Sequence, residues 1–219
     1  MSTRCCIRRS MEGLGVVAAA AMCLVAVACK PEAGPSEPPA AKPTPAARPQ
    51  PQHPKTGPAE GPAMAFTLTS PAFKHGERIP KAHTGEGADT SPPLEWTDPP
   101  EGTKSYALIC DDPDAPVGTW DHWVIWNIPA RFRALPEGVP RSETVATLDG
   151  AAQGKNGWGT IGYRGPMPPP GHGNHHYHFR LYALDTTLDL APRADKKALL
   201  KAMDGHVLAT AELVGLYSR

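Results

Sequence analysis

The sequence predicts a mainly β protein, a two-sheet β-sandwich with a short C-terminal helix. Short β-prone runs alternate with Gly- and Pro-rich turns from Met64 onward. All 14 aromatic residues fall between Phe66 and Tyr217, so the apolar core belongs to this part of the chain. Only Ala194–Met203 has a convincing helical pattern. Many short strands with little helix favour two packed sheets over a layered α/β fold.

The expected strands are rich in β-branched and aromatic residues and are bounded by turn formers. They are Ala65–Thr69, Ser105–Cys110, Trp123–Ile128, Thr144–Leu148 and Tyr177–Leu184. Around the last run, alternate residues share one face: His175, Tyr177, Phe179, Leu181 and Ala183. This face is apolar at its far end, so we expect His175 and Tyr177 to point inward at its mouth.

The expected helix, Ala194–Met203, has Leu199, Leu200 and Met203 on one side, and Asp204-Gly205 ends it. The segment that follows, Val207–Tyr217, is ambiguous between a helix and a closing strand. The sequence leaves these two alternatives open.

Residues 1–28 have the layout of a secretory signal. Three arginines precede the apolar run Leu14–Ala28, which is shorter than the ~20 residues of a spanning helix. The end of this run and Cys29 resemble a bacterial lipobox, in which the cysteine is lipidated. Plain cleavage is the alternative. We therefore expect export across the inner membrane and a lipid anchor on Cys29, at the outer membrane or cell surface.

Residues 29–63 are expected to be a disordered Pro/Ala-rich linker. Lys30–Ala63 holds 11 prolines in 34 residues and has no apolar side chains to bury. Such a segment is a semi-stiff spacer between the anchor and the domain at 64–219. Three of the five cysteines lie in the signal, which leaves Cys29 and Cys110. Disulfides are therefore not expected to stabilise the fold.

The charge balance excludes some partners. Lys plus Arg and Asp plus Glu are 22 each, so nothing in the net charge recruits nucleic acid or an anionic membrane. Any anion must therefore be held by a local arrangement of residues.

Two polar segments follow the apolar run that ends in Cys110. In Asp111–Pro116, prolines lock the backbone beside carboxylates, although composition alone favours an ordinary acidic turn. In Trp120–Pro129, His122 opens an apolar strand, where a lone histidine is more often a core residue than a ligand contact.

A third polar segment, Gly154–Tyr177, is a Gly/Pro-rich loop that leads into the strand carrying His175. Glycines let a backbone approach a ligand and offer N–H groups to oxyanions. His176 and His178 should face away from His175, and no cysteine joins them, so we expect no metal site. Nucleotide-binding, metalloprotease and serine-hydrolase motifs are absent, and we expect no cofactor.

Together these segments resemble the phosphatidylethanolamine-binding protein family, in its bacterial Raf-kinase-inhibitor-like branch. The matching motifs are Asp112–Pro116, His122-Trp123 with Asn127–Pro129, Gly165-Pro166 with His172–Tyr177, Ser91–Trp96, and Gly205–Ala209 with Glu212–Gly215. The resemblance covers roughly Phe66 to the C-terminus.

The resemblance implies a β-sandwich with a small pocket for phosphate-like anions at one end. The implied pocket residues are Asp112, Pro116, Trp120, His122, Gly165, Pro166, His175 and Tyr177, with Asp114 close by. It also implies a cis bond between Ala115 and Pro116. Asp121 stands where human-type members carry histidine, which removes a second histidine from that strand.

In such a pocket the Tyr177 hydroxyl, the histidine N–H groups and the Gly165 backbone N–H would donate to phosphate oxygens. Asp112 is out of place beside an anion unless it orients His122 and keeps it charged, or is itself protonated. Charge-assisted hydrogen bonds contribute about 1.5–3 kcal/mol each, which predicts millimolar to micromolar binding. Binding should weaken as the pH rises through the histidine pKa.

The expected function is that of a membrane-tethered extracytoplasmic protein that binds small anions or phospholipid head groups and is not an enzyme. Two alternatives stay open. One is a protease or kinase inhibitor acting through a protein interface. The other is a weak phosphate-ester hydrolase in which Asp112 and His122 activate water, since no serine, threonine or cysteine stands among the implied pocket residues. A homodimer is also left open.

Overall fold

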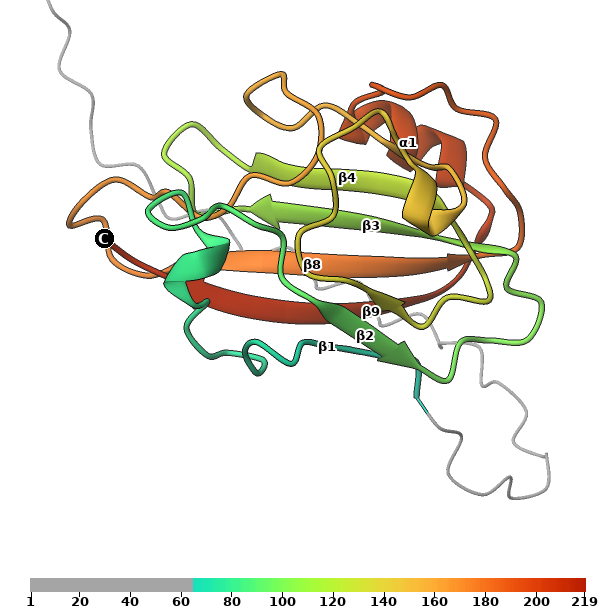
Figure 1. Ribbon diagram of the computed structural model, residues 1–219, viewed down its shortest axis with the longest axis horizontal. Helices are drawn as coiled ribbons and strands as arrows, with labels where there is room; N and C mark the ends of the chain where they lie inside the picture. The colour runs from blue at the N-terminus through green and yellow to red at the C-terminus, as the bar shows by residue number, and fades with distance from the viewer. Residues whose placement is uncertain (1–64) are drawn as a thin grey trace, which may run out of the picture. The chain divides into compact units, whose positions relative to one another are not determined.

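The computed structural model describes residues 65–219 (Figure 1). The expected signal at 1–28, the expected linker at 29–63 and the predicted lipidation site Cys29 lie outside the described residues. Within residues 65–219, no helix is long and apolar enough to cross a bilayer.

The described residues form two antiparallel sheets. The smaller sheet has the order β1-β2-β5, with β1 at Thr67–Thr69, β2 at Leu94–Thr97 and β5 at Ala134–Leu135. The larger sheet has the order β6-β7-β4-β3-β8-β9. Its strands are β6 (Thr144–Val145), β7 (Ala151–Gln153), β4 (Trp120–Pro129), β3 (Ser105–Asp112), β8 (His175–Leu184) and β9 (Val207–Tyr217).

Three short helices complete the fold. They are the α-helix α1 (Lys196–Met203) and the 3-10 helices η1 (Lys81–His83) and η2 (Ala146–Leu148). The α-helix begins two residues later than predicted, because extended Asp195 is its N-cap: its carboxylate accepts the Ala198 N–H at 2.8 Å.

The main core lies between the two sheets. Leu68 and Trp96 of the smaller sheet pack in one apolar cluster with Leu108, Phe179 and Leu213 of the larger one. The predicted β-sandwich with a short C-terminal helix is therefore confirmed.

A second apolar cluster covers the other face of the larger sheet. Ile109 and Val124 pack there with Leu199 and Met203 of α1, which runs beside β4 in Figure 1. All eight residues of β3 are buried as a result. A strand covered on both faces needs a continuous apolar run, which the sequence shows at Tyr106–Cys110.

The predicted strands are present, with differences in detail. Val207–Tyr217 is a strand, because it pairs with β8 along its whole length. The predicted strand Thr144–Leu148 is extended only at Thr144–Val145. It then turns into η2, which ends at Asp149 in the left-handed region (φ 53°).

Three short strands, β2, β5 and β7, were not predicted. Four others differ from their predicted bounds: β1 is shorter, while β3, β4 and β8 are longer at the ends that carry polar residues. The inward face of β8 is as predicted, with His175, Tyr177, Phe179, Leu181 and Ala183 all buried.

Candidate functional site

The candidate site lies at one end of the larger sheet, where β3 ends and β4 and β8 begin. Because β3 pairs antiparallel with both neighbours, Asp112 lies opposite Trp120, and Asp111 lies opposite His178. Residues 63 positions apart, Asp112 and His175, thereby come into contact. The pairing of three strands thus concentrates polar side chains at this end.

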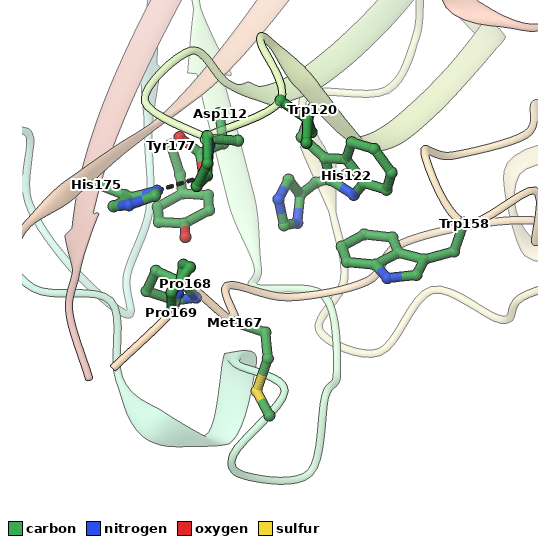
Figure 2. A pocket seen from close by; sticks show the side chains of 12 residues that line it. Asp112, Trp120, His122, Trp158, Met167, Pro168, Pro169, His175 and Tyr177 are labelled. Atoms are coloured by element: carbon green, nitrogen blue, oxygen red, sulfur yellow. Dashed lines mark hydrogen bonds and ion pairs between the residues drawn. The ribbon is translucent and has the colours of Figure 1, made fainter. Parts of the chain in front are cut away.

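These strand ends and two loops enclose a cavity of about 180 Å³ (Figure 2). It is lined by Asp112, Ala115, Pro116, Val117, Trp120, His122, Trp158, Met167, Pro168, Pro169, His175 and Tyr177. Six of the nine residues predicted for the pocket line it. Trp158 and Met167–Pro169 were not among those residues, although they belong to the Gly/Pro-rich segment singled out in the sequence.

The Asp112 carboxylate holds His175. The sequence had led us to expect that it would orient His122. Its Oδ2 accepts a hydrogen bond from His175 Nδ1 at 2.7 Å, and its Oδ1 accepts the Asp114 backbone N–H at 2.9 Å. Both side chains are almost fully buried, at 4% exposure for Asp112 and 1% for His175. This hydrogen bond thus joins β3 to β8, and it does not involve the ring of His122.

His122 is held by the main chain of the loop before Met167. Its Nδ1 donates to the Arg164 carbonyl oxygen at 2.6 Å. Burial lowers the pKa of His122, although the Arg164 carbonyl and the charges of Asp112 and Asp121 oppose the shift. The lowered pKa favours a neutral ring of His122 at pH 7.

Tyr177 stands between the two histidines. Its ring centroid is 5.1 Å from that of His122 and 6.5 Å from that of His175. The hydroxyl is buried and has no hydrogen-bond partner among the described residues. Burial and the charge of Asp112 raise the pKa of Tyr177 well above its ordinary value, so the hydroxyl keeps its proton. An unpaired buried donor on a cavity wall is a candidate ligand contact.

His175 has a second hydrogen-bond partner, the imidazole of His172. The exposed His172 places its Nδ1 2.7 Å from His175 Nε2. One of these two nitrogens donates to the other. The nitrogen of His175 that Asp112 does not use is therefore covered by His172.

Gly165 and Pro166 do not line the cavity. The Gly165 N–H was expected to donate to a ligand. It donates instead to Asp89 Oδ1 at 2.7 Å. A Cβ at Gly165 would lie 2.2 Å from the His83 carbonyl oxygen, so glycine is needed for contact with the η1 main chain. The Pro166 carbonyl accepts the Gly85 N–H at 2.9 Å.

Asp114 also lies outside the cavity lining. Its Oδ2 accepts from the backbone N–H and from Nδ1 of His176, at 2.8 and 2.7 Å, and both side chains are exposed. These hydrogen bonds lower the pKa of the Asp114 carboxyl.

The peptide bond between Ala115 and Pro116 is trans, against the expected cis bond, and residues 65–219 contain no cis bond. A β-turn with proline second reverses the chain, closed by a 3.0 Å hydrogen bond from the Gly118 N–H to the Ala115 carbonyl. Gly118 takes a φ of 94°, which glycine adopts without strain.

Asp121 faces away from the cavity toward α1. Its Oδ1 accepts from Lys196 Nζ at 2.8 Å, and the same ammonium group donates to the buried Asp111 at 2.6 Å. Arg180 pairs with Asp111 from β8. This charge cluster connects α1 to the sheet behind the site.

Metal-binding residues are not grouped in the described part of the chain: no three His, Cys, Asp or Glu side chains there could hold an ion together. His176 and His178 point outward, as predicted, and pair with Asp114 and Glu212.

Comparisons with known proteins show the family of this chain. A family model described as phosphatidylethanolamine-binding protein matches residues 69–218. A UPF0098 protein of Pyrococcus horikoshii is 52% identical over 156 residues, which cover 71% of this chain and 78% of the relative. One of Methanothermobacter thermautotrophicus is 54% identical over 154 residues, which cover 70% and 99% of the two chains.

Two solved structures are similar as well. A phosphatidylethanolamine-binding protein homologue of Chlamydia trachomatis has a TM-score of 0.64 and 42% identity, and covers 71% of this chain and 98% of its own. Escherichia coli YbcL has a TM-score of 0.66 and 37% identity, and covers 70% and 98%. This chain belongs to the phosphatidylethanolamine-binding protein family.

Proposed function

We propose that this protein binds a small phosphate-bearing ligand in the cavity between His122 and His175, either a free phosphate compound or a phospholipid head group. The observation that carries the proposal is the Tyr177 hydroxyl, which is 1% exposed as a residue, lacks a partner among the described residues and stands at the cavity wall. Leaving such a group unpaired costs about 1–3 kcal/mol, which a ligand oxygen would recover.

The composition of the wall favours binding over hydrolysis. No serine, threonine or cysteine lines the cavity, and Cys110 is buried in β3 with a pKa raised by burial. A hydrolytic role would require His122 or Asp112 to activate water. Both groups already make hydrogen bonds to neighbouring residues, and no nucleophilic side chain lines the cavity beside them.

The mouth of the cavity is apolar. Val117, Trp158 and Met167, which we call the apolar rim, are 77%, 38% and 45% exposed. The Arg164 guanidinium lies 4.7 Å from the Trp158 ring centroid. Exposed apolar residues around a polar cavity suit a ligand whose phosphate continues into an apolar part, as in a phospholipid.

Tethering at a membrane surface is the second part of the proposal. It is supported by the apolar run before Cys29 and by the Pro-rich segment that follows. Incorporation of a fatty-acid analogue into the wild-type chain, and its loss in Cys29→Ala, tests this part. Equal recovery of both chains in the soluble fraction would contradict it.

Binding is tested by NMR titration of the full chain with phosphate, phosphoethanolamine and phosphocholine. We expect dissociation constants from millimolar to micromolar, and a loss of about tenfold in Tyr177→Phe, since one hydrogen bond to a charged ligand is removed. Tyr182→Phe is the matched control, because Tyr182 lies on the same strand and on its other face. No chemical-shift change with any ligand would refute the proposal.

An inhibitory role is the second candidate, and the exposed apolar rim is the observation that favours it. It predicts that Met167→Asp abolishes capture of a protein partner while phosphate binding persists. Partner capture that phosphoethanolamine displaces would instead place the cavity itself in the interface.

A further inference from the structure

The cavity presents hydrogen-bond acceptors as well as donors. The Arg164 carbonyl oxygen can only accept, so the Nδ1 of His122 carries the proton of that 2.6 Å hydrogen bond. In a neutral imidazole the other nitrogen, Nε2, is then an acceptor. The buried carboxylate of Asp112 is a second acceptor on the cavity wall.

The tautomer of His122 is held from outside the cavity. The Arg164–Gly165 peptide group accepts from His122 at its carbonyl and donates to Asp89 Oδ1 at its N–H, at 2.7 Å. Asp89 pairs in turn with Arg141 at 2.7 Å. A carboxylate at the N–H end polarises the peptide and strengthens its carbonyl as an acceptor. Asp89 is thus a positioning residue for His122.

Donors stand beside these acceptors. Among the described side chains that line the cavity, the Tyr177 hydroxyl and the Trp120 Nε1 are buried donors without partners. A ligand that only accepts hydrogen bonds would satisfy the Tyr177 hydroxyl at the cavity wall. It would also place its lone pairs against His122 Nε2 and Asp112.

We infer that the ligand must donate a hydrogen bond as well as accept them, so that the cavity takes a protonated phosphate and rejects sulfate. This inference rests on the proposed function and defines its ligand class. Inorganic phosphate keeps a proton at neutral pH, while sulfate of nearly the same size keeps none. In an ethanolamine head group, the ammonium supplies the same donor.

The physical basis is the penalty for unpaired buried groups. A site built to accept from a ligand O–H or N–H rejects an analogue without it, because the acceptors lose water and gain nothing. Bringing a fully deprotonated oxyanion against the Asp112 carboxylate adds like-charge repulsion. Both effects act against sulfate and leave protonated phosphate unaffected.

The test is titration of the full chain with phosphate and sulfate at equal ionic strength, with methyl phosphate as a third probe. We expect phosphate to bind at least about tenfold more tightly than sulfate. Methyl phosphate should bind near pH 5 and lose affinity as its second proton dissociates at a pH of about 6. Phosphoethanolamine should retain its affinity above that pH, which distinguishes a head group from a simple ester.

Two variants examine the acceptors. Asp112→Asn exchanges one acceptor oxygen for a donor of the same shape and should raise sulfate affinity until it approaches that of phosphate. Asp185→Asn is the matched control, because Asp185 also pairs with a histidine but follows the far end of β8. It should leave the preference unchanged.

Asp89→Asn keeps an acceptor oxygen for the Gly165 N–H and leaves the buried hydrogen bond between Asp112 and His175 intact. It therefore tests the inference even if Asp112→Asn does not fold. The ¹⁵N shifts of the His122 ring should show a smaller Nδ1–H fraction, together with a weaker preference for phosphate. Equal binding of sulfate and phosphate by the wild type, or an Nε2–H tautomer, would overturn the inference. Absence of binding by phosphate and phosphoethanolamine alike would remove the proposed function as well.

Discussion

His122 and His175 line the same small cavity, yet the chain holds them by different means (Figure 2). His175 donates to a buried carboxylate, whereas His122 donates to a main-chain carbonyl. A carboxylate favours a charged imidazole, while a carbonyl supports it far less against the cost of burial. Two histidines of similar burial can therefore be held differently in one site, one by a carboxylate and one by a main-chain carbonyl.

The largest expected effect comes from breaking the support of His175. Asp112→Ala leaves a buried imidazole and the Asp114 N–H without their acceptor, which should lower the free energy of unfolding by about 3–5 kcal/mol. Urea unfolding at neutral pH measures this. Asp114→Ala, which breaks an exposed pair with His176, should cost less than about 1 kcal/mol. Similar losses in both variants would show that burial does not distinguish the two pairs.

The support of His122 can be broken without touching a side chain of the site. Gly165→Ala puts a Cβ 2.2 Å from the His83 carbonyl oxygen, so the contact between the Arg164–Gly165 peptide and the η1 main chain must open. Overpacking of this kind costs about 1–3 kcal/mol. The ¹⁵N shifts of His122 should change, while those of His175 should stay as in the wild type. Changes at both histidines would mean that their supports are not independent.

The neutral state of His122 predicts a pH dependence of stability. Its pKa is lowered from 6.5 by burial, so the unfolded chain binds a proton more readily than the folded one. The free energy of unfolding should therefore decrease as the pH falls through about 6.5. His122→Gln should flatten this slope in thermal unfolding between pH 5 and 8. An unchanged slope would assign the dependence to other groups.

The smallest effect concerns the exposed partner of His175. His172→Ala uncovers His175 Nε2 and should increase phosphate affinity about threefold, since one hydrogen bond worth about 0.5–1 kcal/mol no longer competes. Isothermal titration at constant pH measures the change. Reduced affinity would show that His172 itself contacts the ligand.

Periodicity and motif order predicted much of the site. The inward face of β8 placed His175 and Tyr177 correctly, because alternation along a strand is a local property. The motif resemblance brought Asp112, Trp120 and His122 to the same cavity. Their partners were harder to predict: Asp112 was expected to orient His122, but β3 pairs with the strands of both histidines, and the carboxylate accepts from His175.

The Gly165-Pro166 motif shows why sequence motifs and ligand contacts are not the same. Glycine is required there, as the motif indicates, but its missing side chain admits the η1 main chain instead of a ligand. Asp89, which accepts from Gly165, gave no signal, because it lies in a turn-rich segment 76 residues away. Trp158 could have been suspected from its place in a Gly-rich loop.

The sequence alone determined the sandwich class and the inward face of β8, because strand alternation and apolar composition are readable along the chain. Only the tertiary structure decided that Val207–Tyr217 is a strand and which histidine receives the Asp112 carboxylate. Both depend on contacts between segments that are distant in the sequence. The edge strand β9 gains its hydrogen bonds from β8, and the buried Asp112 carboxylate gains its partner from the same strand.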